Sequence, residues 1–410
     1  MDTVATRSSS IDWKGRAATR LSNGIIELTV LTGGGHLAEF RFLSQTGIQS
    51  PNVFWEAPWI SVDPTDNRLP ELARVYGSVE IGRFLAGFTG HALCLDRFGE
   101  PSTEQAAAGL TLHGEAGVRN WNVMQPANTS EAVCQWNVRL PVAQLRLDRQ
   151  ILLGNRESVV YVKESVYNER NNDHLCHWVQ HATFGPPFLN PAECTVGASA
   201  WRGMTSPFGY EDCSLLKKSR EFVWPYAPHE ESEEAAVDLR YPFSTKRRGF
   251  LAGVQMDPSR QVQYILAVNW KLRLGVGYCF RQQDFPWMAI WEENCTHSSS
   301  PWNASTQARG MEFGTTPMPP GPSETFPGCE LFDTPVWCTI PASGTRKMQY
   351  VIFLVKIPIG MHTIENVEAK GDAIEFYGDH GDASLSIPAH GCEAFLSADD
   401  APDGTIELQQ

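Results

Sequence analysis

The sequence lacks any long apolar run. No stretch in its 410 residues approaches the ~20 apolar residues that a membrane-spanning helix needs. The first residues, Met1 to Ser8, also lack the apolar region of a secretory signal peptide. We therefore expect a cytoplasmic protein that has no membrane partner.

Clusters of positive charge are scarce as well. The formal net charge is −14 and the sequence pI is near 5.3. The longest basic runs are Lys217-Lys218 and Lys246-Arg247-Arg248, which are too short for a nucleic-acid footprint. Nucleic acids and polyanionic substrates are therefore not expected partners.

The cysteines show no pattern that points to disulfides or a metal. The 10 cysteines have no Cys-x-x-Cys spacing, so we interpret them as reduced thiols of the core. His174, His177 and His181 suggest a metal site, but a histidine pair on a strand binds zinc only when further ligands arrive from elsewhere. Nothing in the sequence identifies such ligands, so we expect neither a metal nor a cofactor.

What the sequence has is β-structure. The hydrophobic share of 42% and the charged share of 20% are ordinary for a globular protein with a sizeable core. Only the stretch from Glu104 to Ala108 looks helical, and 34 Gly and 27 Pro supply turns. Together these features predict an all-β fold, a large antiparallel β-sandwich. The strand-like segments are residues 25–31, 133–140, 144–152, 159–167, 272–280 and 348–357.

The chain shows no internal repeat and no linker. A length of 410 residues allows one large domain or two closely packed lobes. We expect residues 1–20 to form a flexible N-terminal segment and residues 21–400 to form a single β-sandwich domain.

Two histidine-containing segments stand out from the rest of the sequence. One is Leu112-His113-Gly114-Glu115-Ala116-Gly117, followed by Trp121, and the other runs from Gln180-His181-Ala182-Thr183 to Leu189. Each places a histidine near the end of a predicted strand. Imidazole holds or releases a proton near neutral pH, and small neighbours leave room for a ligand. The two histidines are therefore candidates for one shared substrate site.

These segments resemble those of the aldose 1-epimerases, also called galactose mutarotases. The segment at His113 resembles the family's Leu-His-Gly-Gly…Trp segment, and the segment at His181 resembles its His-Pro-Tyr-Phe-Asn-Leu segment. Residues 285–294 and 310–317 resemble the family's later strands, the second of which carries a catalytic glutamate. The sequence departs from the family pattern at Glu115, at Ala182-Thr183 and at Trp291-Glu292-Glu293. The resemblance thus points to a divergent relative.

The resemblance implies a fold and a set of roles. It implies the large sandwich of the mutarotase-like superfamily, with His181 as general acid and Glu312 as general base. It also implies that His113 binds substrate and polarises the ring oxygen, and that Arg83, in Gly82-Arg83-Phe84, contacts the substrate.

The residues themselves support some of these roles and leave alternatives open. Glu312 lies between Met311 and Phe313, where desolvation would raise the pKa of its carboxyl group toward that of a useful base. Glu292 and Glu293 compete for that role, because adjacent strand residues face opposite sides. Trp287 and Trp291 have the spacing to share a face and form a platform for a sugar ring.

Three functions remain open on the sequence alone. The first is an enzyme, an isomerase that interconverts the anomers of an aldose or a sugar derivative by His/Glu acid-base catalysis. The second is a glycoside hydrolase or lyase on the same type of sandwich, in which carboxylates flank a glycosidic bond. The third is a non-catalytic carbohydrate-binding protein. In each case the expected partner is a small-molecule carbohydrate, and the expected state is a monomer or homodimer.

Overall fold

The structure, a computed structural model, describes residues 7–43, 49–66, 69–124, 133–208, 210, 213–232, 234–243, 247–320, 330–378 and 383–397. Antiparallel strands dominate this part of the chain, and most of them belong to two large sheets. The all-β fold predicted from the sequence is thereby confirmed.

The larger sheet has 14 strands within the described ranges, and it carries strands from both halves of the sequence. β5 and β10 join its N-terminal and C-terminal parts. In spatial order the strands are β1 (Arg7–Trp13), β2 (Arg16–Ser22), β3 (Ile26–Leu31), β4 (Leu37–Phe42), β5 (His91–Asp96), β10 (His174–Phe184), β20 (Gln307–Gly314), β19 (Trp287–Asn294), β16 (Phe250–Met256), β12 (Ala200–Thr205), β13 (Glu221–Val223), β14 (Tyr226–Pro228) and β15 (Ala236–Asp238), and β23 (Cys338–Ile340) pairs with one end of β10.

The second sheet has eight strands in the described residues. Its order is β11 (Cys194–Ala198), β17 (Val262–Asn269), β18 (Leu274–Arg281), β24 (Thr345–Lys356), β9 (Val159–Asn168), β8 (Leu145–Leu153), β7 (Val133–Leu140) and β6 (Asn122–Met124). Five of these strands, β18, β24, β9, β8 and β7, contain segments whose apolar patterns predicted strands, whereas β11, β17 and β6 were not predicted.

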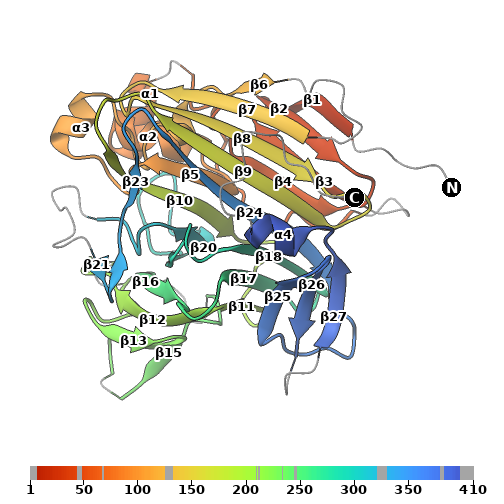
Figure 1. Cartoon of the computed structure of the whole chain (residues 1–410). Coiled ribbons are helices and arrows are strands. Elements are labelled where there is room, and N and C mark those ends of the chain that lie inside the picture. The colour runs from red at the N-terminus through yellow and green to blue at the C-terminus, as the bar shows by residue number, and fades with distance from the viewer. Residues whose placement is uncertain are drawn as a thin grey trace.

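The main core lies between the two sheets, which Figure 1 shows as stacked layers. Leu28 and Val30 of β3 pack in the same buried cluster as Val160 and Val162 of β9. Because successive strand residues point to opposite faces, alternate residues of each strand fill this layer. This arrangement explains why buried apolar residues recur with period two.

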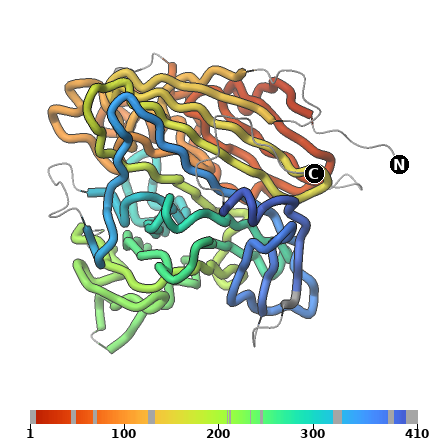
Figure 2. Tube along the Cα trace, viewed as in Figure 1, coloured from red at the N-terminus to blue at the C-terminus, as the bar shows by residue number. Residues whose placement is uncertain are grey.

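The second sheet is buried on its other face too. Val159 and Tyr161 of β9 contribute to a separate apolar cluster with Phe376. That cluster also draws on a three-stranded sheet of β25 (Asn366–Lys370), β26 (Ala373–Tyr377) and β27 (Ala383–Pro388), and on helix α4 (Cys392–Ser397). Figure 2 shows these blue segments at the opposite side of the molecule from the orange helical segment near residues 69–107. Burial on both faces accounts for the continuous apolar run in β24.

That helical segment lies between β4 and β6. It comprises α1 (Leu69–Tyr76), α2 (Val79–Gly87), α3 (Thr103–Ala107) and the 3-10 turn η1 (Ala116–Val118). Ser78 caps α2 by accepting a hydrogen bond from the Ile81 amide at 3.1 Å. A small hairpin of β21 (Glu330–Leu331) and β22 (Thr334–Pro335) completes the described elements. In the described ranges no helix is long and apolar enough to cross a membrane.

The N-terminal segment differs from expectation. Residues 7–20 lie in β1 and β2, whose ladder pairs Arg7 with Ser22 and Trp13 with Arg16, so they form an edge of the larger sheet. The prediction of a flexible segment was wrong for these residues, because β1 consists largely of exposed Ser and Arg side chains and lacks an apolar pattern. Residues 1–6 and 398–400 lie outside the described residues. The single domain of residues 21–400 stays a prediction.

Candidate active site

His181 and Glu312 are brought together by neighbouring strands. The β10–β20 ladder pairs Gln180 with Phe313, which places His181 beside Glu312. Met311 and Phe313 face the core, so Glu312 projects from the opposite face of the sheet. The Nε2 atom of His181 lies 3.3 Å from Oε1 of Glu312, and the two residues are only 5% and 1% exposed. The two groups predicted to transfer protons are therefore neighbours.

The His181 ring is held by a residue that departs from the family pattern. Its Nδ1 lies 2.9 Å from the hydroxyl oxygen of Thr183, which is two residues further along the same face of β10. This contact turns Nε2 toward Glu312. The contact at 3.3 Å lacks hydrogen-bond geometry, so Oε1 of Glu312 has no hydrogen-bond partner in the described part of the chain. An orphaned carboxyl oxygen in a cavity is free to bind a substrate group.

Burial favours the uncharged forms of both groups. It lowers the pKa of His181 to about 3 and raises the pKa of Glu312 well above its usual 4.5. A neutral imidazole that donates from Nδ1 to Thr183 leaves Nε2 as an acceptor that faces a protonated Glu312. The two groups that could exchange a proton thus lie 3.3 Å apart, and burial favours the uncharged form of each.

His113 reaches the same place from a turn rather than from the end of a strand. Its Nδ1 accepts a hydrogen bond from the Gly99 amide at 3.1 Å, so a neutral His113 carries its proton on Nε2 as a donor. Gly114 follows with a φ of +84°, and a Cβ there would lie 2.2 Å from the Leu95 carbonyl oxygen. The close approach therefore requires glycine. The rings of His113 and His181 are 5.2 Å apart between centroids.

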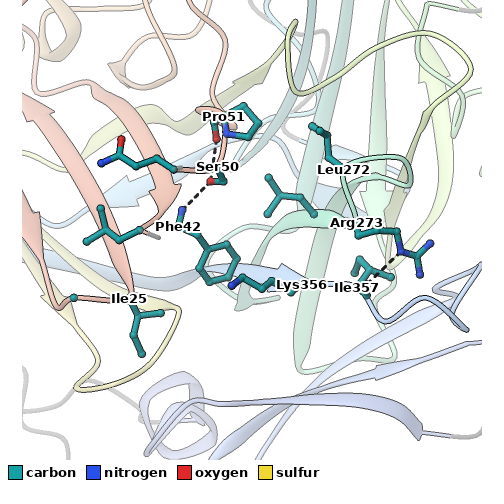
Figure 3. Close-up of a pocket in the computed structure, with 12 residues that line it drawn as sticks. Ile25, Phe42, Ser50, Pro51, Leu272, Arg273, Lys356 and Ile357 are labelled. Atoms are coloured by element: carbon teal, nitrogen blue, oxygen red, sulfur yellow. Dashed lines mark hydrogen bonds between the residues drawn. The ribbon is translucent and has the colours of Figure 1, made fainter. Parts of the chain in front are cut away.

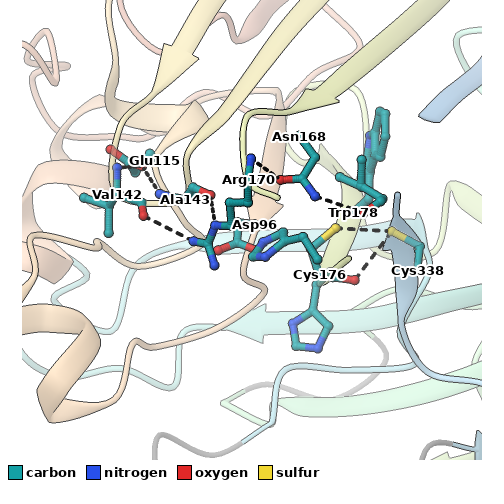
Figure 4. Close-up of polar contacts among 12 residues, drawn as sticks. Asp96, Glu115, Val142, Ala143, Asn168, Arg170, Cys176, Trp178 and Cys338 are labelled. Carbon is teal, nitrogen blue, oxygen red and sulfur yellow. Dashed lines mark hydrogen bonds and ion pairs between the residues drawn. The ribbon is translucent and has the colours of Figure 1, made fainter. Parts of the chain in front are cut away.

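Glu115, which Figure 4 shows beside Val142 and Ala143, holds this turn in place. One of its oxygens accepts hydrogen bonds from the amides of Val142 at 2.9 Å and Ala143 at 3.0 Å, and the other pairs with Arg119. Glu115 is 1% exposed. The carboxylate at this position, where the family has glycine, thus ties the His113 turn to the β7–β8 connection.

The three residues open onto a cavity of about 520 Å³ on the face of the larger sheet away from the main core. Its walls come from α1 and α2, from β10, β16, β19 and β20, and from the loops between strands. The lining residues are Tyr76, Ile81, Phe84, Leu85, Phe88, Phe98, Gly99, Glu100, Leu112, His113, His181, Phe208, Tyr210, Leu251, Trp291, His297, Trp302, Glu312, Pro319 and Pro320.

The other predicted site residues divide between the cavity and its surroundings. Trp291 lines the cavity, with its ring centroid 6.1 Å from that of His181. Trp287 is not among the lining residues, because it is fully buried and its indole donates to the Pro335 carbonyl at 2.7 Å beneath the β21–β22 hairpin. Arg83 lies on α2 and also does not line the cavity.

The competing carboxylates are both engaged elsewhere. Glu292 points into the protein, where it pairs with Arg309 and accepts a hydrogen bond from the Phe243 amide at 3.0 Å. Glu293 is fully buried and is bound by the hydroxyl group of Thr296 and by Nδ1 of His297. Neither lines the cavity, and among the described lining residues Glu312 is the carboxylate in contact with His181.

Sequence reasoning missed several lining residues. Phe84 and Phe88 come from α2 and the residue after its end, and the i, i+4 spacing of the two rings was the available signal. His297 follows Glu293 by four residues and lies with its ring 5.4 Å from that of Trp302. The side chain of Tyr210 is hydrogen-bonded to Trp291.

The other histidines of β10 do not converge. Nε2 of His174 lies 2.6 Å from Oδ1 of Asp96, and His177 stacks on Trp337 at 4.4 Å. Near them, Figure 4 shows Cys176 of β10 beside Cys338 of β23, with their sulfurs 3.3 Å apart. Across the described ranges, no group of three or more His, Cys, Asp and Glu side chains has the arrangement of a metal site.

A second hollow, of about 650 Å³, lies between the β3–β4 region and the β17–β18 turn (Figure 3). Its described lining includes two cationic side chains, Arg273 and Lys356, and no carboxylate or histidine. Lys356 lies over the ring of Phe42, and Arg273 donates to the carbonyls of Ile357 and Met361. This hollow lacks a pair of groups suited to proton transfer, so the histidine cavity is the candidate active site.

Comparison with solved structures identifies the fold. A candidate aldose 1-epimerase from Klebsiella pneumoniae subsp. pneumoniae MGH 78578 is similar over 85% of this chain and 82% of its own, with 15% identity and a TM-score of 0.57. A galactose mutarotase-like protein from Clostridium acetobutylicum is similar over 87% and 99%, with 12% identity and a TM-score of 0.55. A galactose mutarotase related enzyme from Lactobacillus acidophilus is similar over 86% and 98%, with 11% identity and a TM-score of 0.51.

No protein-family model and no curated protein matches the sequence. The structural likenesses, at 15% identity or less, show the fold alone. The chain therefore has the galactose mutarotase-like fold, as the sequence motifs predicted.

Proposed function

We propose that this protein interconverts the anomers of a sugar or a sugar derivative. The observation that carries the proposal is the 3.3 Å contact between His181 and Glu312 in a cavity of about 520 Å³. Anomer exchange needs one group that protonates the ring oxygen and another that takes the proton of the anomeric hydroxyl. A histidine and a glutamate on adjacent strands supply both within reach of one sugar ring.

The proposed reaction moves one proton around a closed cycle. For ring opening, His181 gives the Nε2 proton to the ring oxygen while Glu312 takes the proton of the anomeric hydroxyl. The bond between the ring oxygen and the anomeric carbon breaks, and an open-chain aldehyde results. After rotation about the bond next to the carbonyl, the two residues exchange roles: Glu312 returns its proton to the carbonyl oxygen while His181 takes the proton of the attacking hydroxyl. No proton is gained or lost.

The resting pair is suited to this cycle. The uncharged form, with a neutral His181 and a protonated Glu312, differs from the form that opens the ring only in the position of one proton. Because burial favours the uncharged form, placing that proton on His181 costs energy that binding of the sugar must offset. His113, a donor through Nε2, would stabilise negative charge on a substrate oxygen.

A hydrolase receives less support from the geometry. Glycosidases use two carboxyl groups that flank the scissile bond. Glu292 is committed to Arg309 and Glu293 to Thr296 and His297, outside the cavity lining. Glu100, the second carboxylate of the lining, is an exposed residue, whereas Glu312 is buried.

Exchange spectroscopy tests the proposal directly. Purified protein is added to a panel of sugars, and NMR saturation transfer between the two anomeric proton signals is compared with the same solution without protein. We expect catalysed exchange for at least one sugar. Binding without any catalysed exchange, across sugars that bind, would identify a carbohydrate-binding protein instead.

A further inference from the structure

The cavity has few polar side chains in its interior. The three that meet there are His113, His181 and Glu312, and the proposed function engages all of them at the ring oxygen and the anomeric hydroxyl. The inference below rests on that function. If it is correct, the remaining hydroxyl groups of a bound sugar must find partners on the other walls.

Those walls are apolar and aromatic. Phe84 stacks on Phe88 with 5.0 Å between centroids, and Phe88 lies 4.9 Å from the His181 ring. Phe98 lies 5.2 Å from the His113 ring, and Trp302 lies 6.1 Å from Trp291. These rings surround the proton-transfer pair with apolar surface. Each buried sugar hydroxyl that faced them unpaired would weaken binding by about ten- to hundred-fold.

Several of the other polar lining groups are occupied or belong to exposed residues. The Tyr210 hydroxyl accepts a hydrogen bond from the Trp291 indole and keeps its own O–H as a donor, and the backbone amide of Gly99 is used by His113. Glu100 and His297 are exposed residues, and Nδ1 of His297 is bound by Glu293. The hydroxyl groups of Tyr76 and Tyr210 and the indole N–H of Trp302 are thus the few side-chain partners that the described lining leaves to the other hydroxyl groups of a sugar.

The charge of the lining excludes another class of sugar. Among the described lining residues, Glu100 and Glu312 are acidic, and none is Lys or Arg. Phosphate groups are bound by arginine, by lysine or by the N-termini of helices. A sugar phosphate would bring negative charge into a lining that offers it no cation.

We propose that the substrate is an uncharged sugar with a free anomeric hydroxyl whose other hydroxyl groups are in part missing, alkylated or arylated. Such a molecule presents the ring oxygen and the anomeric hydroxyl to His181 and Glu312. Its apolar edge then packs against the phenylalanine and tryptophan walls, where burial of apolar surface favours binding.

A set of matched sugars tests this inference. The probes are glucose, 6-deoxyglucose, 2,3,4,6-tetra-O-methylglucose and glucose 6-phosphate, which all retain the anomeric hydroxyl and the ring oxygen. Catalysed exchange is measured by NMR, and affinity is measured by quenching of tryptophan fluorescence. Relative to glucose, we expect kcat/KM to be at least tenfold higher for the methylated sugar and several-fold higher for the deoxy sugar. We expect no catalysis with glucose 6-phosphate.

The outcomes separate this inference from the proposed function. A higher kcat/KM for glucose than for both apolar probes, or efficient exchange of glucose 6-phosphate, overturns the substrate class and leaves the isomerase intact. Tighter binding of an apolar probe without any exchange supports the ligand class and overturns the isomerase. Equal affinity for all the uncharged probes also overturns the substrate class.

A pair of matched variants tests the role of the wall. Trp302→Gln places an amide on the aromatic wall, and Trp201→Gln makes the same change at an exposed residue of β12 outside the cavity. We expect Trp302→Gln to lower the preference for the methylated sugar over glucose by at least fivefold and Trp201→Gln to leave it unchanged. An unchanged preference in a folded Trp302→Gln protein contradicts the proposal.

Discussion

Nε2 of His181 lies 3.3 Å from Oε1 of Glu312, and the hydroxyl of Thr183 holds the opposite nitrogen of the same ring at 2.9 Å. The three side chains project from one face of adjacent strands, and a backbone ladder fixes their spacing. A site built on paired strands holds its geometry more precisely than one built on loops.

Thr183→Val should lower turnover while leaving the fold intact. Valine preserves the branched shape but removes the oxygen that orients Nδ1 of His181, so the ring is free to turn Nε2 away from Glu312. We expect kcat to fall about tenfold, in the range of one lost hydrogen bond, with KM nearly unchanged. Thr29→Val is the matched control, because Thr29 is fully buried in β3 and bonds to Glu39 instead. Equal kcat values for Thr183→Val and the wild type would show that the contact does not orient the catalytic ring.

His113→Ala should act mainly on binding. The side chain offers a donor at Nε2 but makes no contact with the Glu312 carboxyl comparable to that of His181. We expect KM for the exchanged sugar to rise at least tenfold and kcat to fall by less. Steady-state exchange rates at several sugar concentrations separate the two parameters. A loss confined to kcat would assign His113 to proton transfer.

Glu115→Ala should destabilise the protein. The substitution removes the acceptor for the amides of Val142 and Ala143 and leaves these donors without a side-chain partner. A loss of about 2–4 kcal/mol in the free energy of unfolding is expected, from urea titration. Because Glu115 also anchors the His113 turn, we expect the same substitution to raise KM for the exchanged sugar. A stability change below ~0.5 kcal/mol would mean that the turn does not depend on this carboxylate.

Stability should fall as the pH falls below about 6.5. Burial lowers the pKa of His36, His91, His177 and His181 to about 3 each, so between pH 6.5 and 3 the unfolded chain binds more protons than the folded one. Stability then rises with pH over this window, by up to ~1.4 kcal/mol per pH unit for each histidine. The raised pKa of Glu312 acts in the opposite direction, since its stabilisation is lost as the pH rises through the folded value.

Urea unfolding at pH 7 and pH 5 measures this effect. We expect a lower midpoint at pH 5, and we expect His177→Gln, which removes one of these groups, to reduce the difference between the two pH values. An equal difference between the two pH values in His177→Gln and in the wild type would contradict a lowered pKa for His177.

The sequence predicted five strands of the second sheet and, in the helical segment, only α3. β7 and β9 begin at the predicted residues because their apolar patterns reflect burial in the core. Helix α2 was missed because it has only nine residues and contains Gly82 and Gly87, which are weak helix formers. Thus the apolar pattern identifies strands that form the core but not the short helix that covers the cavity.

Strand geometry places some of the predicted site residues at the cavity, whereas turns and distant segments draw others away from it. The resemblance predicted His181 and Glu312 as a catalytic pair, and the β10–β20 register places them side by side on one face. Trp287 shares that face, but the β21–β22 hairpin, far away in sequence, covers it. Parity also left Glu293 open as a base, whereas its bonds to Thr296 and His297 depend on how the chain turns after β19. Contacts made by turns and distant hairpins are not encoded in a local pattern.

The central claim is that Glu312 exchanges protons with the sugar, and the anomer exchange rate of Glu312→Gln tests it most directly. Glutamine preserves the volume of the side chain and one acceptor but takes no proton. On a sugar that the wild type exchanges, we expect kcat to fall by roughly two to four orders of magnitude with affinity nearly unchanged, and Glu293→Gln to lose much less. Wild-type exchange by Glu312→Gln, together with a collapse in Glu293→Gln, would contradict the account and move the base to β19.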